Sequence, residues 1–149
     1  DGMRESVMLE DWPTGKEVHY DAALAEKWSK LLALRSELTK ALETARQNKE
    51  IGHSLDASIT VYADGDVFKR LNEVKDQLAA LLIVSEAHLV EGRDSAPAEA
   101  VATEEGHLSV VVKPSEFEKC ERCWIHRETV GQNAEHPTLC HRCVDVLTK

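Results

Sequence analysis

Four cysteines carry the clearest chemistry in this sequence. They form two C-x2-C pairs, Cys120 with Cys123 and Cys140 with Cys143, separated by 16 residues. A two-residue gap lets both sulfurs of one turn face the same ion at about 2.3 Å, and two such turns complete a tetrahedron. Thiolates favour zinc over magnesium or calcium, and four protein ligands leave no position for a reactive water. The spacing therefore predicts one structural zinc ion, which supplies folding energy to a segment poor in apolar residues.

Three other uses of these residues stay open at this point. Two disulfides would also employ four cysteines, although the chain opens with no pattern typical of a signal peptide. A redox pair would place one C-x2-C motif at the start of a helix, whereas this chain has two equivalent motifs. A nearby histidine could also replace one cysteine as a zinc ligand; the candidates are His126, His136 and His141.

Basic and aromatic residues surround the cysteines. Arg122 and Arg142 occupy equivalent positions within the two turns, and Lys119 and Arg127 lie close by in the sequence. These cations can offset the negative charge of a zinc–thiolate cluster, contact phosphates, or do both. Trp124 follows the second cysteine. We expect it to pack against the module's own core, and the alternative is stacking on an unpaired base.

Charge is distributed unevenly along the chain. The 149 residues have a formal net charge of -9, with 42% hydrophobic and 30% charged residues, as in a globular protein. Residues 1–112 hold 12 Lys and Arg against 21 Asp and Glu, whereas residues 113–149 hold 6 of each. A polyanion site is therefore expected in the C-terminal segment or along one helix face. The longest apolar run, Leu78 to Val84, is far shorter than the roughly 20 residues of a membrane helix.

The hydrophobic pattern predicts an α+β fold. It consists of a long N-terminal helix, a small sheet of about three strands with one packed helix, and the C-terminal four-cysteine zinc module. The long helix is expected to run from its N-cap Asp21 to about Lys49, with Gly52 just past its end. The remaining elements are strands at 54–62, 82–89 and 108–112, and one helix from Asp64 whose apolar stripe continues to Leu81. Residues 91–106 contain four alanines and five acids, which favour a flexible linker.

The motifs around the cysteines allow a comparison with a known family. Lys119-Cys-Glu-Arg-Cys-Trp124, followed by Leu139-Cys-His-Arg-Cys143, resembles the C-terminal zinc module of bacterial isoleucyl-tRNA synthetases. Upstream, Lys49-Glu-Ile-Gly-His-Ser-Leu-Asp-Ala57 is similar to the stretch with which this family leaves its anticodon-binding helical domain. Ile83-Val84-Ser85 is similar to the strand that follows. The resemblance covers nearly the whole chain in the expected order.

The resemblance implies a division into three regions. Residues 1–52 would end the helical anticodon-binding region, 53–113 would form a small α+β domain with the flexible acidic linker 91–106, and 114–149 would be a tRNA-contact module. The whole protein would be a monomeric, cytoplasmic, ATP-dependent ligase that joins isoleucine to tRNA(Ile), with no membrane partner. The family's nucleotide-binding signatures, a His-x-Gly-His turn and a Lys-Met-Ser-Lys-Ser loop, do not occur here. We therefore expect a fragment without catalytic residues, which binds tRNA but cannot use ATP.

The expected RNA contacts extend to the long helix, and two other functions remain open. Lys27, Arg35 and Arg46 are weaker RNA candidates, because a solvated helix face explains them equally well. Formamidopyrimidine-type DNA glycosylases end in a related four-cysteine finger. They need an N-terminal proline and glutamate that this chain lacks, and their finger usually has glycine where Trp124 stands. The third possibility is a zinc module that binds another protein.

Overall fold

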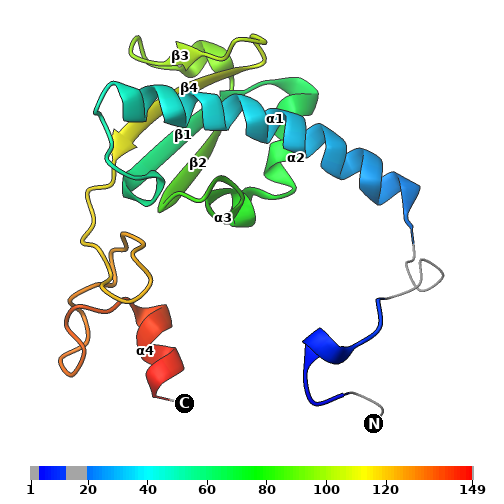
Figure 1. Cartoon of the computed structure of the whole chain (residues 1–149). Coiled ribbons are helices and arrows are strands. Elements are labelled where there is room, and N and C mark those ends of the chain that lie inside the picture. Colours follow the sequence, from blue (N-terminus) through cyan, green and yellow to red (C-terminus); the bar gives the residue numbers. More distant parts are fainter. Residues whose placement is uncertain (1–3, 13–19, 149) are drawn as a thin grey trace. The chain divides into compact units, whose positions relative to one another are not determined.

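The computed structural model describes residues 4–12 and 20–148. Two compact units are distinguished, Asp1–Lys30 and Leu31–Lys149. The first includes the 3-10 turn η1 (Val7–Leu9) and the start of the long helix. Every sheet strand and the four cysteines belong to the second unit. The predicted α+β fold is confirmed (Figure 1), and so is the cluster of four cysteines near the C-terminus.

The long helix α1 (Ala22–Gln47) forms as the sequence predicts at its start. The Asp21 carboxylate accepts a hydrogen bond from the Leu24 amide at 3.0 Å and so satisfies one free N–H of the first turn. The apolar residues buried along α1 recur at steps of three and four; they are Leu31, Leu34, Leu38, Leu42 and Ala45, and Glu37 is buried beside them. The expected C-terminal role of Gly52 is wrong, because Lys49 adopts the left-handed conformation (φ 63°) that ends the helix.

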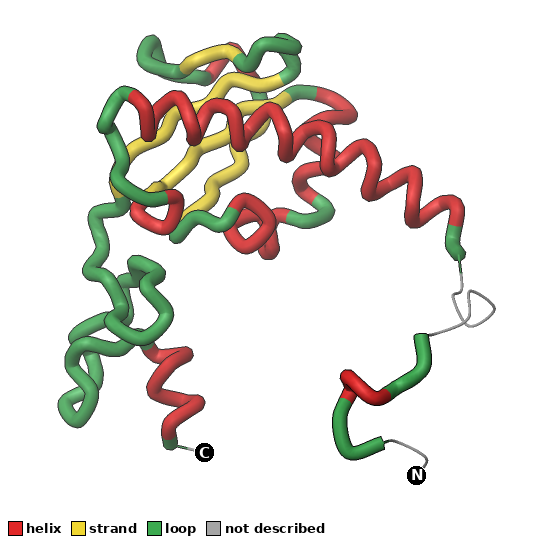
Figure 2. The backbone as a smooth tube through the Cα atoms, viewed as in Figure 1, coloured by secondary structure: helices red, strands yellow, loops and turns green. Residues whose placement is uncertain are grey.

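A four-stranded sheet forms the centre of the second unit, in the order β2-β1-β4-β3, with the two-residue strand β3 (Val101–Ala102) at one edge (Figure 2). β1 (Ala57–Ala63) pairs in parallel with β2 (Glu86–Glu91) and antiparallel with β4 (Leu108–Pro114). Its side chains alternate between buried and half-buried, as the sequence pattern predicts. This register places the start of β1, the start of β2 and the end of β4 at one end of the sheet.

The one helix that was expected to pack on the sheet is divided in two. α2 (Gly65–Asn72) and α3 (Leu78–Leu82) are separated by the 3-10 turn η4 (Lys75–Gln77). Leu71 and Leu78 stay buried on either side of the break, so the apolar stripe is real although the helix is not continuous. The expected strand start at Leu82 is also wrong. Leu82 ends α3, and Ile83 takes a left-handed conformation (φ 59°) before β2 begins.

The segment expected as a linker contains a fourth strand. β3 (Val101–Ala102) pairs antiparallel with Val110 and Ser109 of β4, and the 3-10 turn η5 (Arg93–Ser95) precedes it. Glu37 of α1, which is buried, contacts this region. Its Oε2 accepts a hydrogen bond from Thr103 Oγ1 at 2.6 Å, and its Oε1 lies 3.1 Å from His107 Nδ1. The sheet is therefore one strand larger than expected.

The hydrophobic core lies between one face of the sheet and the helices. α1 crosses the strands in Figure 1. Apolar residues from α1, α2, α3 and the strands belong to a single buried cluster. The cysteines form a second, separate cluster, which is accompanied by Val130 and Leu139. The zinc module, defined here as residues 117–148, therefore has a core of its own and obtains little stabilisation from apolar burial.

Candidate metal centre

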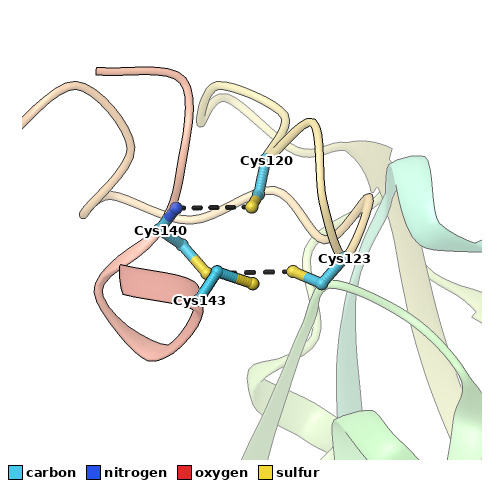
Figure 3. A group of neighbouring side chains, drawn as sticks. All are labelled: Cys120, Cys123, Cys140 and Cys143. Carbon is cyan, nitrogen blue, oxygen red and sulfur yellow. Dashed lines mark hydrogen bonds between the residues drawn. The ribbon is translucent and has the colours of Figure 1, made fainter. Parts of the chain in front are cut away.

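The four cysteine sulfurs converge at the centre of the zinc module (Figure 3). All four sulfur atoms lie within 4.8 Å of one another, and Cys123 Sγ is 3.8 Å from Cys140 Sγ. A tetrahedron with zinc–sulfur bonds of 2.3 Å has sulfurs about 3.8 Å apart, so the cluster has the dimensions that zinc requires. All four cysteines are free, whereas the disulfide alternative required them to be paired.

Backbone geometry brings the two pairs together. Cys120 and Cys123 lie in a tight turn in which the Trp124 amide donates to the Cys120 carbonyl at 2.8 Å. The second pair spans the start of α4 (His141–Leu147), with Cys140 as the N-cap residue and Cys143 in the first turn. The Cys140 amide donates to Cys120 Sγ at 3.3 Å, which connects the two turns directly. Such N–H donors stabilise a thiolate before any ion binds.

The sulfurs differ in how readily they ionise. Burial raises the pKa of Cys120, but backbone amides that donate to its sulfur prevail and lower that pKa to about 6. Burial raises the pKa of Cys123 to about 12, and burial likewise raises the pKa of Cys140. The Cys120 sulfur is thus ready as a thiolate at neutral pH, whereas Cys123 and Cys140 have to give up protons when they bind a cation.

The three histidines considered as alternative ligands do not join the cluster. Within the described part of the chain, the metal-binding group formed by this segment consists of the four cysteines. His126 Nδ1 lies 2.6 Å from the Phe117 carbonyl oxygen, and the His136 amide donates to Asn133 Oδ1. His141 Nδ1 lies 3.4 Å from Asp145 Oδ2. The structure therefore supports a four-cysteine site that can bind one zinc ion.

Arg122 lies directly against the cluster. Its Nη1 is 3.7 Å from Cys143 Sγ, so the guanidinium can offset the negative charge of the thiolates. Of the two roles that the sequence suggested for this arginine, charge compensation therefore has a structural basis. Contact with a phosphate is compatible with it, because the residue is also exposed.

Trp124 does not pack into the module. It is 60% exposed, so the expectation that it joins the module's core is wrong. Its backbone is left-handed (φ 65°), a conformation that costs a residue with a side chain about 1–2 kcal/mol and that glycine adopts freely. The turn therefore holds a large aromatic ring at the surface at some conformational cost.

The remaining basic candidates fall into two groups. Lys119, Arg127 and Arg142 are exposed and belong to the zinc module. On α1, Arg35 is half-buried and donates to the Leu81 carbonyl at 2.8 Å, and Arg46 makes two hydrogen bonds to Glu43 at 2.8 and 2.7 Å. Lys27 is exposed on the part of α1 that belongs to the first unit. The module residues are thus exposed, whereas Arg35 and Arg46 on the helix already have partners within the protein.

Sequence reasoning missed two residues that contact the zinc module from the sheet, Asp56 and Ser85. Ser85 Oγ accepts a hydrogen bond from the His126 amide at 2.7 Å, across 41 positions of sequence. Asp56 Oδ1 lies 3.5 Å from His126 Nε2. Both residues stand just before a strand, and nothing in a periodicity pattern marks such positions.

The class of the module follows from comparison with known protein families. Residues 117–146 match a zinc finger described as "found in FPG and IleRS". The match covers all four cysteines together with Arg122 and Trp124. These residues are therefore a zinc finger of that type, with four cysteines close enough to share one ion.

The chain as a whole is similar to bacterial isoleucine–tRNA ligases. It is 43% identical over 139 residues to the enzyme of Caldanaerobacter subterraneus subsp. tengcongensis and 46% identical over 142 residues to that of Shewanella piezotolerans. The enzyme of Bacillus cereus is 45% identical over 143 residues. These matches cover 93%, 94% and 96% of the chain, and the chain spans 15% of each relative. The resemblance noted from the sequence is confirmed.

One further property concerns membranes. Among residues 4–12 and 20–148, no helix is both long enough and apolar enough to cross a bilayer.

Proposed function

We propose that this chain is a tRNA-binding region of an isoleucine–tRNA ligase and helps to position tRNA(Ile) through its anticodon side. The observation that carries the proposal is that Trp124, Arg127 and Arg142 are all exposed on one zinc finger. Similarity to isoleucine–tRNA ligases over more than nine-tenths of the chain supports the choice of RNA. Segments 1–52, 53–113 and 114–149 then serve as helical connection, α+β domain and tRNA-contact module.

In this proposal zinc is structural, and its ligands are Cys120, Cys123, Cys140 and Cys143. The ion supplies the cross-link between the two turns, which apolar burial in so small a segment does not. The four thiolates leave no open coordination position, so the ion takes part in no reaction. The chain's own residues do the binding: cations contact phosphates, and Trp124 stacks on an unpaired base.

Aminoacylation itself belongs to other parts of the ligase in this proposal. The nucleotide-binding signatures of that family do not occur among the 149 residues, so we expect the chain alone to be inactive with ATP and isoleucine. The complete enzyme would act as a monomer in the cytoplasm. The basic residues on α1 contribute less, because Arg35 and Arg46 already have partners within the protein.

A binding experiment tests the proposal. The zinc-loaded chain is titrated against tRNA(Ile) and a DNA duplex of equal length at several salt concentrations. We expect preferential tRNA binding that weakens as salt rises, and Arg127→Gln or Arg142→Gln should reduce the salt slope by about one each. Arg70→Gln on α2, outside the zinc module, is the matched control and should leave the slope unchanged. Binding that does not respond to salt would contradict a phosphate-led contact.

DNA binding is the second candidate, because the zinc finger description names FPG as well as IleRS. It predicts that the duplex competes as well as tRNA at matched salt. A four-cysteine finger with a left-handed tryptophan after its second cysteine suits an unstacked base better than a paired one. Equal affinity for both nucleic acids would favour the DNA interpretation.

A further inference from the structure

The zinc module meets the sheet at a small polar joint. It consists of Asp56, Ser85 and His126, and all three lie in the second compact unit. Asp56 precedes β1 and Ser85 precedes β2, so both stand at the same end of the sheet. β4, whose C-terminal end leads into the zinc module, ends there too.

On the module side, the joint is built on a hairpin that main-chain hydrogen bonds hold together. Lys119 and His126 form an antiparallel β-bridge. The Cys120 amide donates to the Ile125 carbonyl at 3.1 Å, and the Arg127 amide donates to the Glu118 carbonyl at 3.1 Å. The hairpin includes the first cysteine pair and Trp124. A displacement of His126 therefore displaces Trp124 with it.

On the sheet side, Ser85 is held in place from two directions. Its hydroxyl donates to the Leu55 carbonyl and accepts from the His126 amide at 2.7 Å. Its own amide donates to the Ala57 carbonyl at 3.1 Å. Since the hydroxyl is both donor and acceptor, its loss leaves a main-chain donor and a main-chain acceptor unsatisfied at once.

Asp56 connects three parts of the unit. Its Oδ2 accepts from the His53 amide at 2.7 Å, and its carbonyl accepts from the Ser115 amide at 2.7 Å. Its Oδ1 faces the module, 3.5 Å from His126 Nε2 and 3.8 Å from Lys119 Nζ. The His126 side chain is largely buried against it, at 17% exposed.

We propose that this joint sets the orientation of the zinc module on the sheet, and that Asp56, Ser85 and His126 are positioning residues for RNA binding. The proposal rests on the proposed function for its RNA part alone. The joint holds the Trp124 ring and the cations of the zinc module in one place relative to the sheet body, the part of the second unit that precedes residue 117. A preoriented surface loses less conformational entropy when it binds than a tethered, reorienting one.

Nuclear magnetic resonance of the zinc-loaded 149-residue chain tests the orientation. Residual dipolar couplings are measured for the strands β1, β2 and β4 and for the zinc module. We expect one alignment tensor to fit both sets in the parent chain. Ser85→Ala should give two different tensors, whereas Ser85→Thr, which keeps the hydroxyl, should restore one. Ser109→Ala, at the opposite end of the sheet, is the control and should keep one tensor.

Zinc content and tRNA affinity of the same variants separate positioning from folding. Ser85→Ala should bind one zinc, as the parent does, and should bind tRNA(Ile) about threefold to tenfold more weakly. Asp56→Asn should act in the same direction, with Asp66→Asn on α2 as its control. Two tensors in the parent, or one tensor in Ser85→Ala, would overturn the joint.

The tRNA-affinity measurement tests the proposed role in RNA binding separately from the joint itself. Two tensors together with an unchanged tRNA affinity in Ser85→Ala would overturn the positioning role while leaving the joint intact. A parent chain that binds no tRNA would overturn the proposed function and the positioning role together. The tensors would still decide whether the joint exists.

Discussion

Glu37 and Thr103 are hydrogen-bonded to each other although 66 positions separate them in the sequence. Glu37 lies on α1 and is 8% exposed, and Thr103 directly follows β3. His107, 3.1 Å from the other carboxylate oxygen, completes the contact. A buried carboxylate of this kind is tolerated because both oxygens have partners, and it connects α1 with the β3–β4 hairpin.

Glu37→Ala should therefore destabilise the chain more than its size suggests. The Thr103 hydroxyl would lose its short partner, and a small cavity would remain beneath α1. We expect a loss of about 1–3 kcal/mol in the free energy of unfolding, measured by urea denaturation. Glu105→Ala, an exposed glutamate in the same hairpin, should change it by less than about 0.5 kcal/mol. Equal effects would mean that the contact contributes nothing specific.

Zinc removal should unfold the zinc module and spare the sheet. The two buried clusters share no residue, so the sheet core does not depend on the ion. Purified protein is expected to contain one zinc per chain by elemental analysis. After chelation, amide signals of residues 117–148 should collapse, those of β1 and β4 should persist, and returning zinc should reverse the change. Protein purified without chelator that contains almost no zinc would count against the site.

Zinc binding should strengthen as pH rises. Without the ion, the pKa of Cys123 is raised to about 12 by burial and that of Cys140 is also raised, so these thiols hold their protons near neutrality. The pKa of Cys120 is lowered to about 6, so this sulfur is already ionised there. Coordination needs thiolates, so binding must displace the protons of Cys123 and Cys140. Competition with a chromophoric chelator between about pH 6 and about pH 8 measures this, and a flat profile would contradict it.

Trp124→Gly should affect stability and binding in opposite directions. Glycine adopts the left-handed conformation without steric cost, and the exposed ring makes little contribution to the core. We expect the zinc-loaded chain to unfold no more easily than the parent, and its stability to rise by up to about 1 kcal/mol. Affinity for tRNA should fall by about 1–3 kcal/mol, the contribution of one stacked base. The control is Trp28→Ala on α1 rather than Trp28→Gly, because glycine weakens a helix.

The cysteine site was predictable from the sequence because its information is local. Two residues between ligands and a short connection between pairs are enough to define the cluster, and long-range packing only has to bring two turns together. The start of α1 and the alternation of β1 were predictable for the same reason. Each depends on a cap or a period that is visible within a few residues.

The predictions that were wrong concern features that depend on contacts between residues distant in the sequence. The apolar period from Val67 to Leu81 continues across the turn between α2 and α3, so periodicity alone cannot reveal the break. β3 is two residues long and too short to alternate; it forms because β4 offers an edge and Glu37 holds Thr103. Ile83 and Trp124 are left-handed without being glycine, and such positions carry no sequence signal.

The parallel pairing of β1 with β2 also has a consequence for sequence divergence. It leaves the turns around Asp64, Gly92 and Gly106 at the end of the sheet remote from the zinc finger, where Arg93 contacts both Asp64 and the Gly106 carbonyl. Insertions and deletions there can lengthen or shorten loops without altering how the finger is seated. Length variation among homologues should therefore accumulate in those turns, while the segments Leu55–Ala57 and Ser85–Glu86 should keep a constant length.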